Sequence, residues 1–279
     1  MWSFMSLLSR IYNYFYPVED KTPEVKLVTK GKKYHLVLSG GWIRGFAHIG
    51  VYKALVEHGY HIASVSGTSM GALVGLFIAG QKTPQQIEDI FCAQSLYKFL
   101  DVAFSKEGML STKTIQKAIN TELKENKIEE LPLPFTVCVT DIDKWVPIYY
   151  KKWDIKTIVT ASCAIPGLFK PIRYDGRYLV DGGVCDNFPV SEHNGLPIIW
   201  SHVNPIPKKI SHSGQAISVQ SLELLVYRDI PKQQQSCELF FEPPKLSTVW
   251  QPLFMNPQKI IKIGYDHAMS VLWPLRKKS

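Results

Sequence analysis

The sequence predicts an α/β fold built on a mostly parallel β-sheet flanked by helices. Two observations predict it. An apolar strand pattern at residues 34–39 is followed by a glycine-rich loop at 40–45 and then by a helical pattern. A second apolar strand, 61–65, turns at Ser69 into an apolar helix that ends near Ala79. Because a strand, a crossover helix and a second strand in this order form a parallel pair, the chain opens as an α/β protein.

Further helices and strands follow from the same periodicities. Helical spacing of apolar residues, with Ser111 as an expected N-cap and Pro257 in a first turn, covers residues 85–94, 111–123, 154–164, 215–228 and 256–272. Strand patterns, the third of them a hairpin around Asp175-Gly176, cover residues 134–141, 145–151, 173–180 and 197–203. No repeat or second boundary interrupts residues 34–279, which we expect to form one domain.

Residues 1–16 form a separate amphipathic pattern at the N-terminus. Their apolar residues have helical spacing, and aromatic side chains dominate the segment until Pro17 ends it. The segment is too short to span a bilayer and lacks the basic start of a signal peptide. We expect a helix that lies at a membrane interface or packs on the domain surface. Residues 17–33 then form a polar connector.

The composition is that of a globular chain with a basic surface. Of 279 residues, 46% are hydrophobic and 20% are charged, and the formal net charge is +8. A positive charge favours anionic surroundings, such as membrane headgroups. The basic residues are scattered, and neither a zinc pattern nor a long basic helix accompanies them, so we expect no nucleic-acid partner. Oligomeric state is not predicted.

The five cysteines indicate free thiols. Their number is odd and no Cys-x-x-Cys pair occurs, which argues against a disulfide framework or a structural metal site. Free thiols are typical of a reducing compartment, so we expect a cytoplasmic protein. The positive net charge adds the expectation of transient contact with an anionic membrane surface.

Ser69 has the sequence context of a serine nucleophile. Glycines stand two residues before and after it, at Gly67 and Gly71, where a strand turns into a helix. Side chains at these positions would collide in so sharp a turn, which explains the glycines. The turn would hold the Ser69 hydroxyl at a helix N-terminus, where unpaired N–H groups favour negative charge.

A serine hydroxyl also needs a base and donors for the oxyanion. The Gly40-Gly41 pair leaves backbone N–H groups unobstructed and follows a strand, so it should share the carboxyl edge of the sheet with Ser69. Two kinds of base remain open. Asp181 ends an apolar strand and would act directly if burial raised its pKa. A Ser-His-Asp triad would instead use a histidine, the candidates being His48, His58, His193, His202, His212 and His267.

Four sequence blocks together resemble the patatin-like phospholipases. In family order they are Leu38-Ser39-Gly40-Gly41 with the following Arg44-Gly45, then Gly67-Thr68-Ser69-Met70-Gly71, Ala161-Ser162-Cys163-Ala164-Ile165-Pro166-Gly167, and Asp181-Gly182-Gly183. The resemblance covers residues 34–189 of the expected catalytic domain. The remainder, 190–279, and residues 1–16 have no such match.

The resemblance implies a three-layer α/β sandwich and a serine hydrolase of lipid acyl esters, of the phospholipase A or lysophospholipase type. It implies a Ser-Asp dyad that needs no metal or other cofactor, with Ser69 as the nucleophile and Asp181 as the proton acceptor. The backbone of Gly40, Gly41 and Trp42 would form the oxyanion hole. Supporting positions of the motifs are Arg44, Gly45, Gly67, Gly71, Gly182 and Gly183.

Trp42 departs from the family pattern, because it stands where a third glycine is usual. Its N–H survives the change, but a tryptophan at positive φ would carry strain of about 1 kcal/mol or more. The indole would occupy the acyl path or line the lipid site. Because Trp42 would block the site, a non-catalytic lipid-binding or scaffolding protein stays open as an alternative. A His-dependent esterase or acyltransferase that uses Ser69 with His193 or His267 is a second alternative.

Overall fold

The computed structural model describes most of the expected domain, namely residues 31–92, 113–190, 195–206, 217, 224, 227, 229–248 and 256–276. The strands are β1 (Lys33–Leu38), β2 (His61–Thr68), β3 (Phe135–Asp141), β4 (Val146–Tyr150), β5 (Ile172–Tyr174), β6 (Arg177–Asp181), β7 (Ile198–Ser201) and β8 (Leu239–Phe241). The α-helices are α2 (Ala47–Glu57), α3 (Met70–Ala79), α4 (Pro84–Cys92), α6 (Lys113–Glu122), α7 (Ile155–Ser162), α9 (Ile230–Gln234) and α10 (Pro257–Arg276). Short 3-10 helices are η1 (Trp42–Phe46), η2 (Ile128–Glu130), η3 (Gly182–Val184) and η4 (Pro244–Thr248).

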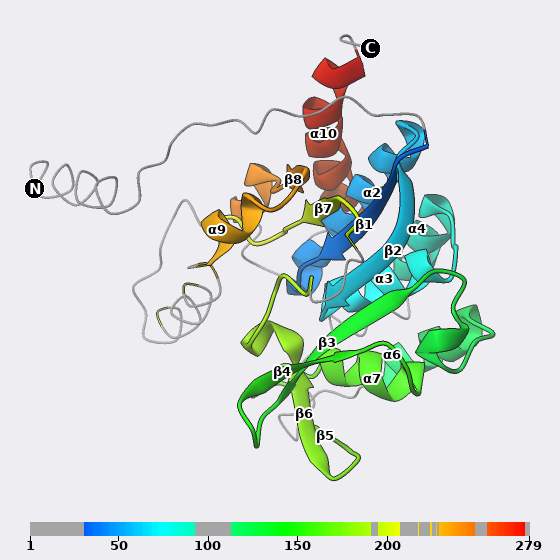
Figure 1. Cartoon of the computed structure of the whole chain (residues 1–279), viewed down its shortest axis with the longest axis vertical. Helices are drawn as coiled ribbons and strands as arrows, with labels where there is room; N and C mark the ends of the chain where they lie inside the picture. The colour runs from blue at the N-terminus through cyan, green and yellow to red at the C-terminus, as the bar shows by residue number, and fades with distance from the viewer. Residues whose placement is uncertain are drawn as a thin grey trace, which may run out of the picture.

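The sheet is mixed and mostly parallel, as the sequence predicts (Figure 1). Its order is β5-β6-β3-β2-β1-β7-β8, and β4 also pairs with β3. The strands β3, β2, β1, β7 and β8 are parallel, whereas β4 and β6 run antiparallel to β3. Since β4 pairs with β3 from Val137 to Asp141, β2 and β6 must share the opposite edge of β3, one after the other.

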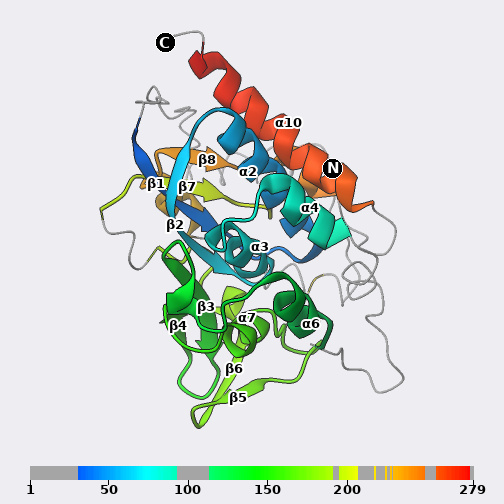
Figure 2. The same cartoon turned by 90° about the vertical axis from the view of Figure 1, so that its right-hand side faces the viewer.

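Helices and sheet form layers around a core on each face. Leu36 and Leu38 of β1 point into the larger core, which α2, α3, α4, α6, α7 and α10 help to fill. Val37 lies between them in the strand and belongs to a second core with Trp200 and Ile230 of α9. This alternation is the period of a strand buried on both faces, and it places the sheet between two layers. Figure 2 shows α10 lying across α2 and α4 on the first face.

Most of the expected elements are present, with shifted ends. β2 continues to Thr68, beyond the expected end at residue 65, because Ser66, Gly67 and Thr68 still pair with β3 despite their polarity. The strand β8 and the helices η2 and α9 are short elements that the apolar pattern did not predict. The expected helix 1–16, most of the connector 17–33 and the N-cap Ser111 lie outside the described residues. So does most of the expected helix 215–228, of which residues 217, 224 and 227 are helical.

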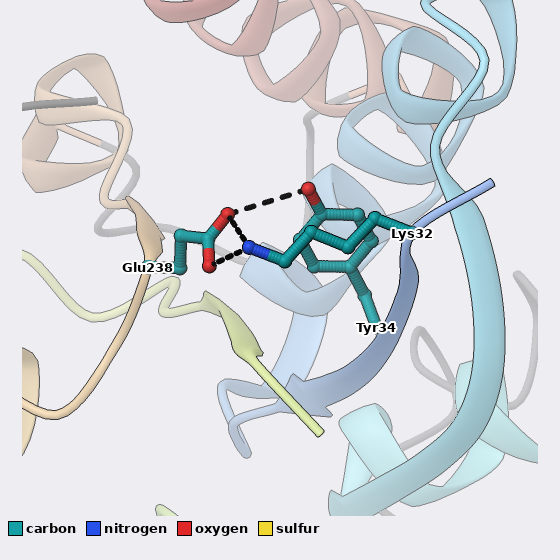
Figure 3. Close-up of polar contacts among 3 residues, drawn as sticks. All are labelled: Lys32, Tyr34 and Glu238. Carbon is teal, nitrogen blue, oxygen red and sulfur yellow. Dashed lines mark hydrogen bonds and ion pairs between the residues drawn. The ribbon is translucent and has the colours of Figure 1, made fainter. Parts of the chain in front are cut away.

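A polar cluster joins β1 to the turn before β8, at the end of the sheet where both of these strands begin (Figure 3). The Lys32 ammonium donates to both carboxylate oxygens of Glu238, at 2.5 and 2.7 Å. The hydroxyl of the buried Tyr34 donates to the same carboxylate at 3.3 Å. The pKa of Tyr34 is raised, mainly by burial and to a smaller extent by the negative charge of Glu238. Because β7 lies between β1 and β8, this cluster links the two strands on either side of β7 at the ends where they begin.

Two glycines allow α2 and α10 to pack in backbone contact. A side chain at Gly50 of α2 would collide with the carbonyl oxygen of Ile261, and one at Gly264 of α10 would collide with the carbonyl oxygen of Ala47. The two helices therefore approach more closely than ordinary side chains permit.

We predict that Gly264→Ala lowers the free energy of unfolding by about 1–3 kcal/mol, although alanine is the better helix former. The added methyl group would have to push α10 away from the Ala47 backbone. Urea unfolding followed by circular dichroism measures the change. Ser270→Ala, at an exposed position of the same helix, is the matched control and should change stability little. Equal stability of the two variants would contradict this account of the helix pair.

Candidate active site

Ser69 occupies the turn between β2 and α3. Its backbone has φ 54° and ψ −125°, a left-handed conformation that costs a non-glycine residue about 1–3 kcal/mol. A side chain at Gly67 would collide with the carbonyl oxygen of Gly71, and one at Gly71 would collide with the carbonyl oxygen of Leu38. The crowding predicted around this turn is thus present, and the glycines let it lie against the end of β1.

The Ser69 hydroxyl donates a hydrogen bond of 2.5 Å to the Oδ2 atom of Asp181. The two residues are 112 positions apart, and strand pairing brings them together. Thr68, at the end of β2, pairs with Cys138 of β3, and the next residue of β3, Val139, pairs with Asp181. Asp181 therefore lies on the same edge of β3, immediately beyond the end of β2.

Burial raises the pKa of the Asp181 carboxyl group to about 6. The side chain is shielded from solvent, and its charged form is stabilised only in part by the Ser69 hydroxyl and by the Gly183 N–H, which donates to Oδ1 at 2.8 Å. The condition under which an aspartate could act directly as a base is therefore met: the group still ionises near neutral pH but holds a proton more strongly than a free aspartate.

Ser162, at the end of α7, supports the backbone of the turn. The N–H of Ser69 donates to the Ser162 hydroxyl oxygen at 2.8 Å, and that hydroxyl donates to the carbonyl oxygen of Cys138 at 2.7 Å. Ser162 is fully buried, so both bonds are shielded from water. The sequence placed Ser162 in one of the four blocks but gave it no role. Because its N–H is engaged, Ser69 does not offer this donor to an oxyanion.

The loop after β1 lies directly against Ser69 and is held from both sides. A Cβ atom on Gly40 would lie 3.1 Å from that of Ser69, so a larger residue would crowd the hydroxyl. The Gly40 N–H donates to Asn187 Oδ1 at 2.9 Å, and its carbonyl oxygen accepts from Asn204 Nδ2 at 2.7 Å. Neither asparagine was singled out in the sequence. The position of Asn187 shortly after the Asp181-Gly182-Gly183 block could have indicated that it lies near the site.

The expected oxyanion loop therefore offers fewer free amides than the sequence suggested. The Gly40 N–H is occupied by Asn187. In the part of the chain that the structure describes, the N–H groups of Gly41 and Trp42 have no hydrogen-bond acceptor. The carbonyl of Gly41 accepts from the N–H of Arg44 at 3.0 Å, which closes the loop into η1. Of the three amides expected to form the oxyanion hole, those of Gly41 and Trp42 are thus the ones not engaged by another described residue.

Trp42 has a φ of 49°, so its backbone keeps the left-handed conformation that a glycine adopts easily. Residue 42 therefore has the positive φ at which a tryptophan is expected to be strained. Its indole is half-buried and packs beside Phe169, with ring centroids 6.4 Å apart. It joins a small apolar cluster next to the site, made of Ala164, Phe169, Ile165, Leu168 and Ile172.

Supporting glycines of the motifs fit their neighbours closely. A side chain at Gly45 would collide with Met70, which is buried as expected, and one at Gly182 would collide with the carbonyl oxygen of Cys138. Gly183 provides the N–H that holds the Asp181 carboxylate. These positions therefore pack the loop, the serine turn and the aspartate turn against one another.

Among the described histidines, none has a hydrogen bond to Ser69, whose hydroxyl bonds to Asp181. His48 is buried between the carbonyl oxygen of Ser39 and the hydroxyl of Ser201, and burial lowers its pKa to about 4. Its Nε2 therefore carries the proton and donates to Ser39, so this neutral ring fixes the end of β1. His202 bonds to Glu242, and the ring of His267 packs on Phe241. His193 and His212 lie outside the described residues.

Within the ranges that the structure describes, no three His, Cys, Asp or Glu side chains are grouped so that they could hold a metal ion. None of the helices described is both long enough and apolar enough to cross a bilayer.

Comparison with known proteins gives one family. The sequence profile of the family described as patatin-like phospholipase matches residues 36–192. An uncharacterized NTE family protein of Mycobacterium bovis is 34% identical over 163 residues, which cover 58% of this chain and 45% of that protein. Patatin-like phospholipase domain-containing protein 6 of Homo sapiens is 32% identical over an alignment of 284 residues, covering 88% of this chain and 20% of that protein. The chain thus spans less than half the length of these relatives.

Two further matches bear on function and fold. Lysophospholipase nte1 of Aspergillus fumigatus is 32% identical over 172 residues, or 60% of this chain and 11% of that protein. The crystal structure of VipD from Legionella pneumophila is similar with a TM-score of 0.54, at 16% identity, and covers 94% of this chain and 73% of that one. The likeness to VipD shows a shared fold.

We predict that Trp42→Gly is more stable than Trp42→Ala by about 1 kcal/mol. Both variants remove the indole and its packing on Phe169, but only glycine also removes the Cβ atom that opposes a φ of 49°. Thermal or urea unfolding of the two proteins measures the difference. A more stable alanine variant would show that residue 42 does not have this backbone conformation.

Proposed function

The chain belongs to the patatin-like phospholipase family, and on that premise we propose that it is a serine lipid acyl hydrolase that cleaves acyl esters of phospholipids or related lipids. The observation that carries the proposal is the 2.5 Å hydrogen bond from the Ser69 hydroxyl to the buried Asp181 carboxylate. The named lysophospholipase among the relatives favours phospholipids or lysophospholipids as the substrate class.

In the proposed mechanism, the Ser69 oxygen attacks the ester carbonyl carbon while its proton moves to Oδ2 of Asp181. The negative charge that develops on the carbonyl oxygen is stabilised by the N–H groups of Gly41 and Trp42. Collapse of the tetrahedral intermediate passes the proton from Asp181 to the leaving alcohol and leaves an acyl group on Ser69. A water molecule, deprotonated by Asp181, then attacks the acyl carbonyl carbon. The bond to Ser69 breaks, the fatty acid leaves, and the proton passes from Asp181 to the Ser69 oxygen.

Three arrangements support this mechanism. The left-handed backbone at Ser69 presents its hydroxyl, and the Ser162 bond holds that backbone. Asn187 and Asn204 fix the backbone of Gly40 beside it, one at its N–H and the other at its carbonyl oxygen. Trp42 keeps the glycine-like φ, so its N–H is retained for the oxyanion, and its indole with the cluster at Ile165 and Leu168 supplies an apolar contact for an acyl chain. This arrangement favours a hydrolase over a scaffolding protein.

We predict that Ser69→Ala and Asp181→Asn each lower ester hydrolysis by at least about 10³-fold. The first variant lacks the attacking oxygen, and the second lacks a carboxylate that can accept its proton. Release of fatty acid from lysophosphatidylcholine and from a monomeric chromogenic ester measures the effect. Near-native turnover in either variant would rule out the dyad.

A fluorophosphonate probe and two histidine variants complete that experiment. The probe should label the wild-type chain and fail to label Ser69→Ala, while failure to label the wild-type chain would favour a non-catalytic lipid-binding protein. His267→Ala and His193→Ala should keep turnover near that of the wild type. Loss of turnover in one of them would instead favour a His-dependent esterase or acyltransferase.

We predict that kcat/KM falls on acidification with an apparent pKa of about 6. Asp181 must be ionised to accept the serine proton, so the rate is full above this pH and drops about tenfold per pH unit below it. A free aspartate would place the same limb near pH 4. Rates with a monomeric ester between pH 4 and pH 8, in buffers of constant ionic strength, give the profile. A limb near pH 4 would show that Asp181 is not the buried base.

A further inference from the structure

Four large apolar side chains are exposed together where β3 turns into β4 and along the neighbouring β6. Trp145 is 84% exposed, Tyr178 45%, Val146 43% and Ile142 39%. The N–H of Ile142 donates to the carbonyl oxygen of Tyr178 at 3.1 Å, so the two strands are adjacent at this point. We call these four residues, with the exposed Lys144 between them in sequence, the hairpin tip.

The hairpin tip is held by the buried Asp141. Its Oδ1 atom accepts hydrogen bonds of 3.1 Å from the N–H groups of both Asp143 and Lys144, and its carbonyl oxygen accepts from Trp145 at 2.9 Å. Trp145 has a φ of 61°, in the left-handed region. An exposed tryptophan in a costly backbone conformation contributes nothing to the core, so its side chain is free to contact a partner.

The hairpin tip lies beyond Ser69 and Asp181, at the same end of the parallel strands. Asp181 pairs with Val139 at the level where β2 ends and Ser69 begins. From Val139 the strand β3 continues past this level, and Ile142 lies three residues, or roughly 10 Å, further along. In Figures 1 and 2 the turns of β3–β4 and β5–β6 both project at the end of the molecule opposite the C-terminus.

The chemistry of the hairpin tip suits an anionic bilayer. Lys144 lies beside Trp145 in sequence, and the guanidinium of the exposed Arg173 lies 5.9 Å from the centre of the Tyr178 ring. Tryptophan and tyrosine prefer the headgroup region of a membrane, and lysine and arginine bind its phosphates. Asp143 and Asp175 are the exposed acidic residues nearby in sequence, while the whole chain carries a formal net charge of +8.

The shape of the hairpin tip favours a bilayer over a protein partner. The exposed apolar residues stand in the β3–β4 turn or within two residues of a projecting turn. A stable protein interface needs about 800 Å² on each partner, usually around a central apolar patch. A few side chains on a projecting rigid turn can instead enter the headgroup layer without a matching surface.

We propose that the hairpin tip inserts into the headgroup layer of anionic phospholipid membranes and so presents the Ser69 site to lipid. The proposal rests on the proposed function, because it gives the hydrolase its route to a substrate held in a bilayer. It assigns the membrane contact to residues of the catalytic domain itself, in addition to any contribution from residues 1–16. Insertion breaks no covalent bond and needs no cofactor.

Co-sedimentation of the full chain with sucrose-loaded vesicles tests the proposal. Vesicles of phosphatidylcholine containing phosphatidylserine should bind the wild-type chain more tightly than vesicles of phosphatidylcholine alone, and salt should weaken the binding. Trp145→Gly should lower the affinity by at least about tenfold. Because glycine adopts a φ of 61° without strain, this variant should be at least as stable as the wild type. Lys144→Gln should reduce only the preference for phosphatidylserine.

Trp153→Ala is the matched control. Trp153 is also exposed, at 57%, but it follows the other end of β4, where Tyr150 pairs with Val137, so it lies at the far end of these strands from the hairpin tip. This variant should bind vesicles as the wild type does. Wild-type affinity of Trp145→Gly, or absence of binding by the wild type, would overturn the proposal.

The catalytic variant separates this proposal from the proposed function. Ser69→Ala should bind the same vesicles as tightly as the wild type, whether or not the chain hydrolyses esters. Vesicle binding that depends on Trp145 in a chain without ester hydrolysis would leave the membrane contact standing and reject the hydrolase. Hydrolysis of a monomeric ester with vesicle binding independent of Trp145 would do the reverse.

Discussion

The close approach of the β2–α3 turn to the end of β1 is the constraint on which the site depends. Gly67 and Gly71 leave no side chain between the turn, the carbonyl of Leu38 and the helix that follows. Ser69 is thereby forced to a φ of 54°, and this strain must be balanced by bonds from elsewhere in the fold. The buried Ser162 supplies one of them, because its hydroxyl accepts the Ser69 N–H and donates to β3.

The position of Asp181 follows from an irregular feature of the sheet. β3 is longer than the part of β2 that pairs with it, and its free edge beyond Thr68 is occupied by the antiparallel β6. The last residue of β6 therefore lies where the next residue of β2 would have been, in contact with the serine. Because this place is buried, the carboxylate is destabilised and its pKa rises to about 6. The same pairing that brings the proposed base, Asp181, to the proposed nucleophile, Ser69, thus also raises the pKa of the base.

The glycine-rich loop is fixed by side chains that come from distant parts of the chain. Asn187 accepts from the N–H of Gly40, Asn204 donates to its carbonyl oxygen, and the neutral His48 bonds to the carbonyl of Ser39. These bonds orient the loop without occupying the amides of Gly41 and Trp42. A preorganised loop of this kind needs no rearrangement when charge develops on a substrate oxygen. Trp42 fits because its backbone can still adopt the glycine-like conformation, at a cost in strain.

The sequence by itself determined the features that depend on neighbouring residues. The order of strand, glycine-rich loop, helix, strand and serine turn could be predicted, since apolar period and the spacing of Gly67 and Gly71 are local signals. The short strand β8 gave too brief a pattern to be found. Only the tertiary structure decided which groups are engaged at the site. The family resemblance had paired Ser69 with Asp181, but the bonds of Ser69 to Ser162 and of Gly40 to Asn187 and Asn204, between residues 93 to 164 positions apart, were not predicted. Strand pairing and burial select such partners, and neither is encoded in a short stretch of sequence.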